Sequence, residues 1–205
     1  MDAARVVKSE HELQLIRKAC EITQRAHVNV LSYLKDLENE TEIEAIFAGT
    51  CIAEQAKHQA YGIIAGSGEN ASTLHYGANN EPLEGRQLVC LDAGVEWKEY
   101  ASDVTRTFPI SGTWTPEAKG IYDIVAKMQD ECIAMVKPGV SLNTQLLLKS
   151  SMLTTIIGRL PPDPHARSQS CHQRSPRTTS PPKRNMAGTL LIRSIRRFLP
   201  PWSRP

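Results

Sequence analysis

The chain has 205 residues, of which 40% are hydrophobic and 22% are charged, and its formal net charge is +2. This composition is typical of one globular domain with room for a tail, and it excludes a fibrous or wholly disordered chain. The first residues lack the apolar stretch of a signal peptide, and no apolar run reaches the roughly 18 residues that span a bilayer. The sequence therefore predicts a cytoplasmic protein without a membrane segment.

The small net charge hides an asymmetry between two parts of the chain. Residues 1–143 contain 13 Lys and Arg against 21 Asp and Glu, a net charge of −8. Residues 144–205 contain 11 Lys and Arg against Asp163 alone, a net charge of +10, together with nine of the 13 prolines. The sequence therefore predicts a folded unit over residues 8–143 and a basic, Pro/Ser/Arg-rich, disordered tail over residues 144–205.

Two helices are predicted by capping boxes, in which a serine or threonine precedes a glutamate by three residues. Ser9 and Glu12 form one box, and Thr41 and Glu44 form the other, and apolar residues at helical intervals follow each. Proline is tolerated in a first helical turn, so Thr115-Pro116 predicts the start of a third helix. The expected helices cover residues 9–34, 41–60 and 115–136.

Between the second and third helices the apolar residues follow the period of extended chain. Strands are predicted over residues 62–65, 88–95 and 100–110. The expected fold class is therefore α+β, with an antiparallel sheet flanked by helices. The glycine-rich stretch at 66–71 matches a loose dinucleotide-binding pattern, but no helical periodicity follows it, so it is interpreted as a loop that leads to His75.

Two aspartates lie on the last two predicted strands. If these strands pair as a hairpin around Trp97-Lys98, Asp92 and Asp103 are direct cross-strand neighbours on one face. Their Cβ atoms would then lie roughly 4.5 to 5.5 Å apart, where two like charges repel each other. Because carboxylate pairs suit divalent cations, a metal site is one interpretation of this pattern. The alternative is a pair of surface aspartates on a hairpin with another register.

Three motifs around these residues resemble a known family. They are Leu74-His75-Tyr76-Gly77, Leu91-Asp92-Ala93-Gly94 and YASDVTRTFP, which runs from Tyr100 to Pro109. In this order they resemble the catalytic domain of the Xaa-Pro aminopeptidase and prolidase family, the metallopeptidases with the pita-bread fold. The resemblance covers about residues 8–140, and it implies the first half of that domain.

The resemblance implies a metal-dependent exopeptidase whose substrate is a peptide with proline in second position. It identifies Asp92 as a ligand of one metal ion and Asp103 as a ligand that bridges two, usually two Mn²⁺ ions. It identifies His75 as a histidine of the substrate pocket, which on its own would be explained as a structural histidine bound to backbone. The Thr-Arg-Thr-Phe-Pro sequence after Asp103 resembles the proline-directed branch rather than the methionine aminopeptidases.

The remainder of the family's metal site has no match in this sequence. Family members add a histidine and two glutamates from the segment after the third helix, but after Val140 the only acidic residue is Asp163. His165 and His172 lie in Pro/Ser/Arg-rich sequence that is unsuited to a strand. We therefore expect little or no turnover from this chain. The alternative function is a catalytically inactive, truncated or mis-spliced family member that acts at most as a binding module.

The tail is interpreted as sequence foreign to the fold, produced by altered splicing, a frameshift or an erroneous gene model. Its dispersed arginines could bind nucleic acid through charge, but only Phe198 and Trp202 offer stacking surfaces and no recognised module is present. Prolines cut off the stretch 190–199 before it could form a membrane-surface helix. We predict no specific nucleic-acid partner and no membrane partner, and the oligomeric state, including a homodimer, stays open.

Overall fold

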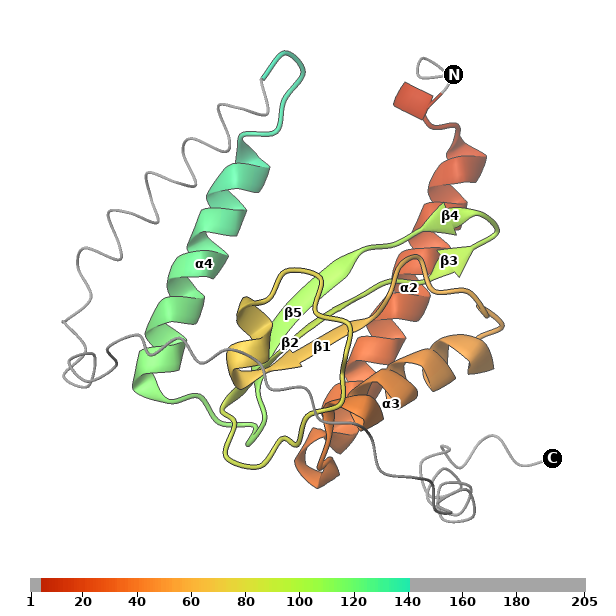
Figure 1. The fold of residues 1–205 in the computed structure, drawn as a ribbon. Coiled ribbons are helices and arrows are strands. Elements are labelled where there is room, and N and C mark those ends of the chain that lie inside the picture. The colour runs from red at the N-terminus through yellow and green to blue at the C-terminus, as the bar shows by residue number, and fades with distance from the viewer. Residues whose placement is uncertain (1–4, 141–205) are drawn as a thin grey trace, which may run out of the picture. The chain divides into compact units, whose positions relative to one another are not determined.

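The computed structural model describes residues 5–140, so the predictions about the tail over residues 144–205 lie outside the described residues. The chain divides into two compact units, residues 1–114 and 115–205, and each is considered by itself. Within the described residues, no helix is both long and apolar enough to cross a membrane. The helices of the first unit are α2 (Glu10–Tyr33), η1 (Leu34–Asp36), α3 (Glu40–Ala53) and η2 (Gly68–Ser72), and its strands are β1 (Ile64–Ser67), β2 (Leu88–Ala93), β3 (Glu96–Trp97), β4 (Tyr100–Ala101) and β5 (Val104–Pro109) (Figure 1).

Helix α2 begins as predicted. The Ser9 hydroxyl accepts a hydrogen bond from the Glu12 amide at 3.4 Å, and the Glu12 carboxylate accepts one from the Ser9 amide at 2.6 Å. Together these two bonds satisfy amides that the first helical turn leaves without partners. The buried residues of α2 recur at helical spacing and form the stripe that faces the core: Ala19, Ile22, Thr23, Ala26, His27 and Val30.

Helix α3 has a different cap from the predicted one. Its N-cap is Asn39, which forms the capping box with Glu42, so the prediction of a box between Thr41 and Glu44 is wrong. The Asn39 side chain already accepts from the Thr41 amide at 2.9 Å, which places Thr41 inside the helix. The helix also ends at Ala53 rather than near Ala60, because Gln55 adopts a left-handed conformation with φ of 68° that a helix cannot continue.

The second unit contains helix α4 (Pro116–Ala134) among its described residues. The Thr115 hydroxyl accepts from the Ala118 amide at 3.3 Å, and Pro116 occupies the first turn. Proline has no amide hydrogen to lose there, because the first helical amides have no partner within the helix. The predicted start of this helix is confirmed.

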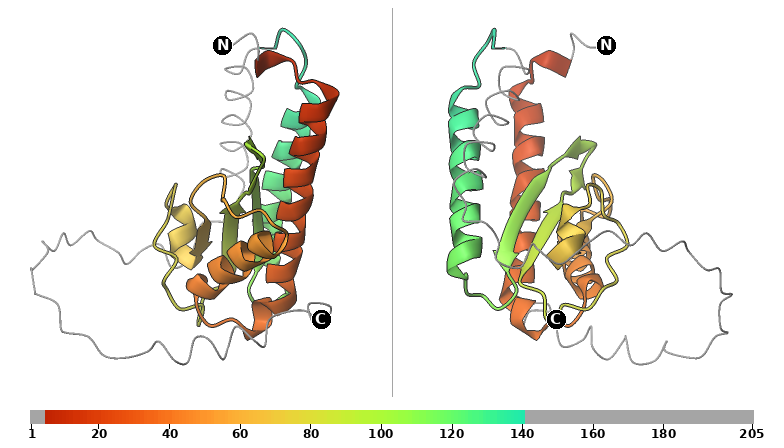
Figure 2. Two further views of the ribbon diagram at one scale, coloured as in Figure 1. Left: turned by 90° about the vertical axis from the view of Figure 1, so that its right-hand side faces the viewer. Right: turned by 60° about the vertical axis from the view of Figure 1, so that its left-hand side comes forward.

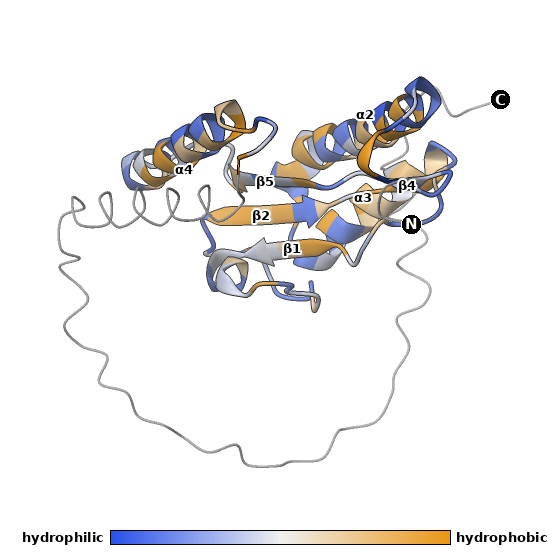
Figure 3. Cartoon of the chain, turned by 90° about the horizontal axis from the view of Figure 1, so that it is seen from above, coloured by the Kyte–Doolittle hydropathy of each residue, from blue (hydrophilic) through white to orange (hydrophobic). Residues whose placement is uncertain are grey.

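The first unit is built on a three-stranded antiparallel sheet in the order β1-β2-β5, with a two-stranded extension, β3-β4. Strand β2 is the hydrophobic centre between β1 and β5 (Figure 3). Its alternate residues Val89, Leu91 and Ala93 are fully buried in the core cluster to which α2 and α3 contribute. Helices α2 and α3 pack against each other, and the sheet lies beside them in both views of Figure 2. This arrangement confirms the predicted α+β class.

The hairpin register differs from the predicted one by two residues. Trp97 pairs with Tyr100, and Asp92 pairs with Thr105, so the prediction that Asp92 directly opposes Asp103 is wrong. The turn consists of Lys98 and Glu99, which both have positive φ, 47° and 69°. Two left-handed residues give a hairpin turn whose twist matches that of the strands. Because the shift is an even number of residues, both aspartates keep the predicted face.

The regular pairing of the hairpin is interrupted at a close approach of its two strands. A Cβ atom on Gly94 would lie 1.9 Å from the Ser102 carbonyl oxygen, so only glycine fits without a backbone shift. This close approach lies two residues after Asp92 and one residue before Asp103. It therefore sets the local separation of the two backbone segments that carry Asp92 and Asp103.

We expect Gly94→Ala to lower the free energy of unfolding by about 2 kcal/mol or more, because the added methyl group overpacks a closed backbone contact. Denaturant unfolding measures this loss. The matched control is Gly49→Ala in α3, where an added Cβ meets nothing within 4 Å. In an exposed helix this control should stabilise by about 0.5 to 1 kcal/mol. Equal effects of the two substitutions would contradict the close approach at Gly94.

A buried carboxylate holds the loop between β1 and β2. Glu40 is fully buried at the first position of α3. Its Oε1 atom accepts from the Ser67 amide at 2.8 Å, the Ser67 hydroxyl at 2.6 Å and the Asn70 side chain at 3.0 Å. Its Oε2 atom accepts from the Tyr76 hydroxyl at 2.7 Å and the Glu81 amide at 3.1 Å. Glu40 therefore ties to α3 the loop that carries His75.

These contacts make the stability of the unit dependent on pH. Burial by itself would raise the pKa of Glu40, but the hydrogen bonds from Ser67, Asn70 and Tyr76 outweigh it and lower the pKa to about 2. A carboxyl group whose pKa is lowered in the folded state stabilises that state above its ordinary pKa of 4.5. This stabilisation is lost as the pH falls from about 4.5 through 2.

We expect Glu40→Gln to cost about 1 to 3 kcal/mol at pH 7, because buried donors lose a charged acceptor. The same variant should lose less stability than the wild type between pH 5 and pH 2, since the titrating group is gone. Denaturant unfolding across this pH range tests both points. Glu69→Gln, which changes an exposed carboxylate in the same loop, is the control and should follow the wild type. A Glu40→Gln pH profile parallel to the wild type would contradict the role of Glu40.

Candidate functional site

The two predicted metal ligands meet at one hydroxyl group. The Tyr61 hydroxyl lies 2.6 Å from Asp92 Oδ1 and 2.9 Å from Asp103 Oδ1. The two carboxylate oxygens therefore lie no farther apart than the sum of these distances, 5.5 Å. Asp92 belongs to β2, Asp103 lies just before β5, and Tyr61 comes from the segment before β1. The structure brings Asp92 and Asp103 together although they are not directly paired.

Tyr61 supplies the proton that makes this proximity tolerable. Burial raises the pKa of the Tyr61 hydroxyl, and its hydrogen bonds to Asp92 and Asp103 raise it further. Tyr61 therefore stays protonated and shares a single O–H between two negatively charged acceptors. One shared proton leaves most of the carboxylate charge without compensation. The pair is therefore an anionic, oxygen-only site.

This donor set fits a divalent cation. Hard and borderline divalent ions prefer carboxylate oxygens, and two oxygens within 5.5 Å can both reach one ion or a pair of ions. Between residues 5 and 140, however, no group of three or more His, Cys, Asp or Glu side chains has the geometry to hold a metal ion. Asp92 and Asp103 thus form a two-carboxylate site within the part of the chain that the structure describes. Their role as ligands stays a prediction.

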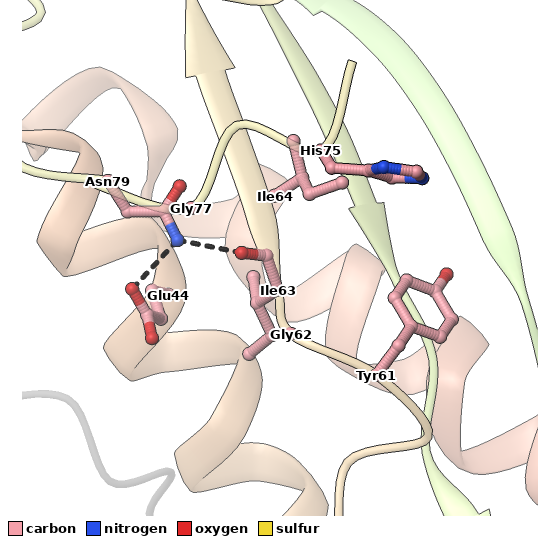
Figure 4. Close-up of a pocket in the computed structure, with 8 residues that line it drawn as sticks. All are labelled: Glu44, Tyr61, Gly62, Ile63, Ile64, His75, Gly77 and Asn79. Atoms are coloured by element: carbon pink, nitrogen blue, oxygen red, sulfur yellow. Dashed lines mark hydrogen bonds between the residues drawn. The ribbon is translucent and has the colours of Figure 1, made fainter. Parts of the chain in front are cut away.

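His75 lies beside this site, on the rim of a cavity. It is exposed, and its backbone has a φ of 59° in the left-handed region, which few residues other than glycine adopt. The cavity has a volume of about 310 Å³ and is lined by Glu44, Tyr61, Gly62, Ile63, Ile64, His75, Gly77 and Asn79. Figure 4 shows the His75 and Tyr61 side chains on the same side of the cavity, away from Glu44 and Asn79. Tyr61 therefore lines the cavity of His75 and also contacts the aspartate pair.

Asn79 holds the opposite wall of this cavity. It is buried, and its side-chain nitrogen donates to Glu44 at 2.9 Å and to the Ile63 carbonyl at 2.8 Å (Figure 4). Its side-chain oxygen accepts from the Ala65 amide at 2.9 Å. One asparagine thus joins α3, the start of β1 and the loop that carries His75. No sequence motif indicates Asn79 or Tyr61 as part of the site.

Comparisons with known proteins identify the family of the chain. The family model for metallopeptidase family M24 matches residues 14–145. A protein of Botryotinia fuckeliana and one of Sclerotinia sclerotiorum, both named as probable Xaa-Pro aminopeptidases, are each 70% identical over 141 residues. In both cases the match covers 69% of this chain and 25% of the relative. The chain therefore spans about a quarter of the length of the curated relatives it matches.

Solved structures show the same similarity. The zinc-substituted aminopeptidase P of E. coli in complex with product has a TM-score of 0.69 and 32% sequence identity, and the match covers 78% of this chain and 37% of that one. Proline aminopeptidase P II from Yersinia pestis has a TM-score of 0.67 and 32% identity, with 74% and 35% covered. The predicted fold class, a partial pita-bread fold, is confirmed. The chain belongs to metallopeptidase family M24.

Proposed function

We propose that this chain binds divalent metal through Asp92 and Asp103, and that the site serves hydrolysis of the bond between an N-terminal residue and a following proline. The observation that carries this proposal is the Tyr61 hydroxyl shared by the two carboxylates, at 2.6 and 2.9 Å. The names of the relatives, Xaa-Pro aminopeptidases and aminopeptidase P, support the substrate class. We propose two Mn²⁺ ions as the physiological cofactor and the cytoplasm as the location.

Each residue of the site has a defined task in this proposal. Asp92 and Asp103 would hold the cations, and Tyr61 contacts both carboxylates. Bound divalent ions would lower the pKa of a water molecule to near neutrality and polarise the peptide carbonyl group. His75, on the cavity rim, can donate an N–H to the carbonyl oxygen as negative charge develops there. The cavity can accept a side chain of the peptide beside the scissile bond.

A second candidate function is a binding module that hydrolyses peptides poorly or not at all. The observation that favours it is the two-carboxylate site, since no third His, Cys, Asp or Glu joins the cluster within residues 5–140. A cation held by so few protein ligands is weakly bound and poorly oriented. We therefore propose that the activity of this chain is impaired relative to its full-length relatives.

The metal site is tested by titrating the purified chain with Mn²⁺ and following the free-ion signal by electron paramagnetic resonance. We expect Asp92→Ala and Asp103→Ala each to weaken binding by more than the roughly 10- to 100-fold that loss of an outer partner costs, because each removes a direct ligand. Asp36→Ala is the control, since it removes an exposed carboxylate from η1. Unchanged affinity in both site variants would reject the metal site.

The activity is tested with an Xaa-Pro dipeptide and added Mn²⁺, with E. coli aminopeptidase P measured in parallel. We expect turnover far below that of the intact enzyme. Asp103→Ala should abolish what remains, and His75→Ala should lower kcat while Mn²⁺ affinity stays unchanged, because His75 is not assigned to the metal. Robust turnover that Asp103→Ala abolishes would show that this chain has a complete site and would exclude the binding-module alternative.

A further inference from the structure

Asp103 lies between two residues that are each bound to helix α2. The preceding residue, Ser102, is buried, and its hydroxyl lies 2.7 Å from the Thr23 hydroxyl. The following residue, Val104, accepts at its carbonyl oxygen from His27 Nε2 at 3.2 Å. Thr23 and His27 are four residues apart, so they lie on the same face of α2, one turn from each other. Two consecutive turns of one helix therefore hold the backbone on both sides of Asp103.

The contact through Ser102 closes a gap in the hairpin. Ser102 lies between β4 and β5, where the regular ladder is interrupted opposite Gly94 and Val95. Its hydroxyl accepts from the Val95 amide at 3.0 Å and lies 3.1 Å from the Val95 carbonyl. Its own amide donates to that carbonyl at 3.0 Å. Thr23, which is fully buried, completes this cluster and anchors the interruption to α2.

The contact through His27 has one defined donor. A carbonyl oxygen only accepts, so Nε2 carries the proton that is donated to Val104. Burial is the main reason why the pKa of His27 is lowered, and a neutral ring leaves Nδ1 without a proton. Nδ1 is buried and has no hydrogen-bond partner among the described residues. The ring also packs edge-on against Phe47, with centroids 5.3 Å apart. The hydrogen bond from Nε2 to the Val104 carbonyl therefore lies directly beside Asp103.

We propose that Thr23 and His27 are positioning residues that hold Asp103 in register with Asp92 and Tyr61. Asp103 is itself exposed and lies outside the paired strands, so the sheet alone does not hold it. The two anchors on α2 supplement the backbone contacts that Ser102 makes with Val95 and that Val104 makes with Ala93. This inference rests on the proposed function, in which Asp103 binds a divalent cation. It assigns a role in that site to a helix that contributes no ligand.

The test compares variants that remove one anchor with variants that retain it. Thr23→Val removes the hydroxyl with little change of shape, whereas Thr23→Ser keeps it. His27→Leu removes the donor, whereas His27→Gln places an amide nitrogen near the position of Nε2. Thr50→Val is the matched control, because the Thr50 hydroxyl also joins two elements, accepting from Asn29 of α2 at 2.8 Å. All variants are made in the full chain.

Two measurements are made on each variant. Amide hydrogen exchange without metal is followed over residues 100–106 and over α3, and Mn²⁺ affinity is measured by the titration described above. We expect Thr23→Val and His27→Leu to accelerate exchange in 100–106 more than in α3, and to weaken Mn²⁺ binding about 10-fold, as loss of an outer partner does. Thr23→Ser and His27→Gln should restore most of both properties. Thr50→Val should not accelerate exchange in 100–106 more than in α3, and it should leave the Mn²⁺ affinity unchanged.

The outcomes separate this inference from the proposed function. If exchange in 100–106 is unchanged in Thr23→Val and His27→Leu, the anchoring is overturned. If exchange rises selectively but Mn²⁺ affinity stays at the wild-type value while Asp103→Ala abolishes binding, the positioning role is overturned and the metal site stands. If the wild type binds no Mn²⁺, the proposed function fails, and selective exchange would still support the anchoring of residues 102 and 104 by α2.

Discussion

The site depends on one electrostatic constraint, which is that two carboxylates held close together need something positive between them. In this structure the Tyr61 proton lies at that position, within hydrogen-bond distance of Asp92 and Asp103. A single proton compensates two negative charges poorly, and a divalent cation does so far better. The scaffold can tolerate this repulsion because Asp92 is fixed by the pairing of β2 with both of its neighbours. Asp103 is less constrained, because it lies outside the paired residues of the sheet.

The same principle explains the buried charge of Glu40. Glu40 is withdrawn from water completely, and its carboxylate is balanced by hydrogen-bond donors from Ser67, Asn70, Tyr76 and Glu81 rather than by a cation in direct contact. Arg86 lies 3.7 Å from Glu40 and adds a positive charge at longer range. A buried carboxylate is stable when hydrogen bonds satisfy it fully. A pair of carboxylates whose negative charge is only partly compensated favours a cation. The first condition describes Glu40, and the second describes the aspartate pair.

The sequence predicts those features that depend on local chemistry. The capping box at Ser9, the start of α4 at Thr115 and the strand character of β2 and β5 each follow from a few neighbouring residues, and each is confirmed. Asn39 is as good a cap as Thr41, and the choice between them depends on Asn79 and Asn80, whose carbonyls accept from Thr41 and Asn39 from a distant part of the chain. The register of the hairpin was missed for a related reason. Lys98 and Glu99 adopt left-handed conformations without the Asn-Gly or Asp-Gly signal that predicts such turns.

The contributions of Tyr61, Asn79 and Glu40 depend on tertiary contacts that sequence patterns do not show. Each meets partners that are 14 to 42 residues away along the chain. A tyrosine before a strand and a glutamate in a first helical turn are both common. Neither spacing indicates that the tyrosine donates to two carboxylates or that the glutamate is a buried acceptor of several hydrogen bonds. The motifs around His75, Asp92 and Asp103 predicted the family, while the groups that orient these residues became visible only in three dimensions.

Helices α2 and α3 therefore position different parts of the candidate site. Helix α3 holds the loop of His75 through Glu40, and helix α2 holds the chain around Asp103 through Thr23 and His27. The distance between His75 and Asp103 thus depends on how α2 packs on α3. That packing includes the bond between Asn29 and Thr50 at 2.8 Å, and Arg25 on α2 contacts the Glu54 carboxylate at 3.0 Å. A shift between the two helices would move His75 relative to Asp103 while leaving each local network intact, which makes the helix pair the rigid frame of the site.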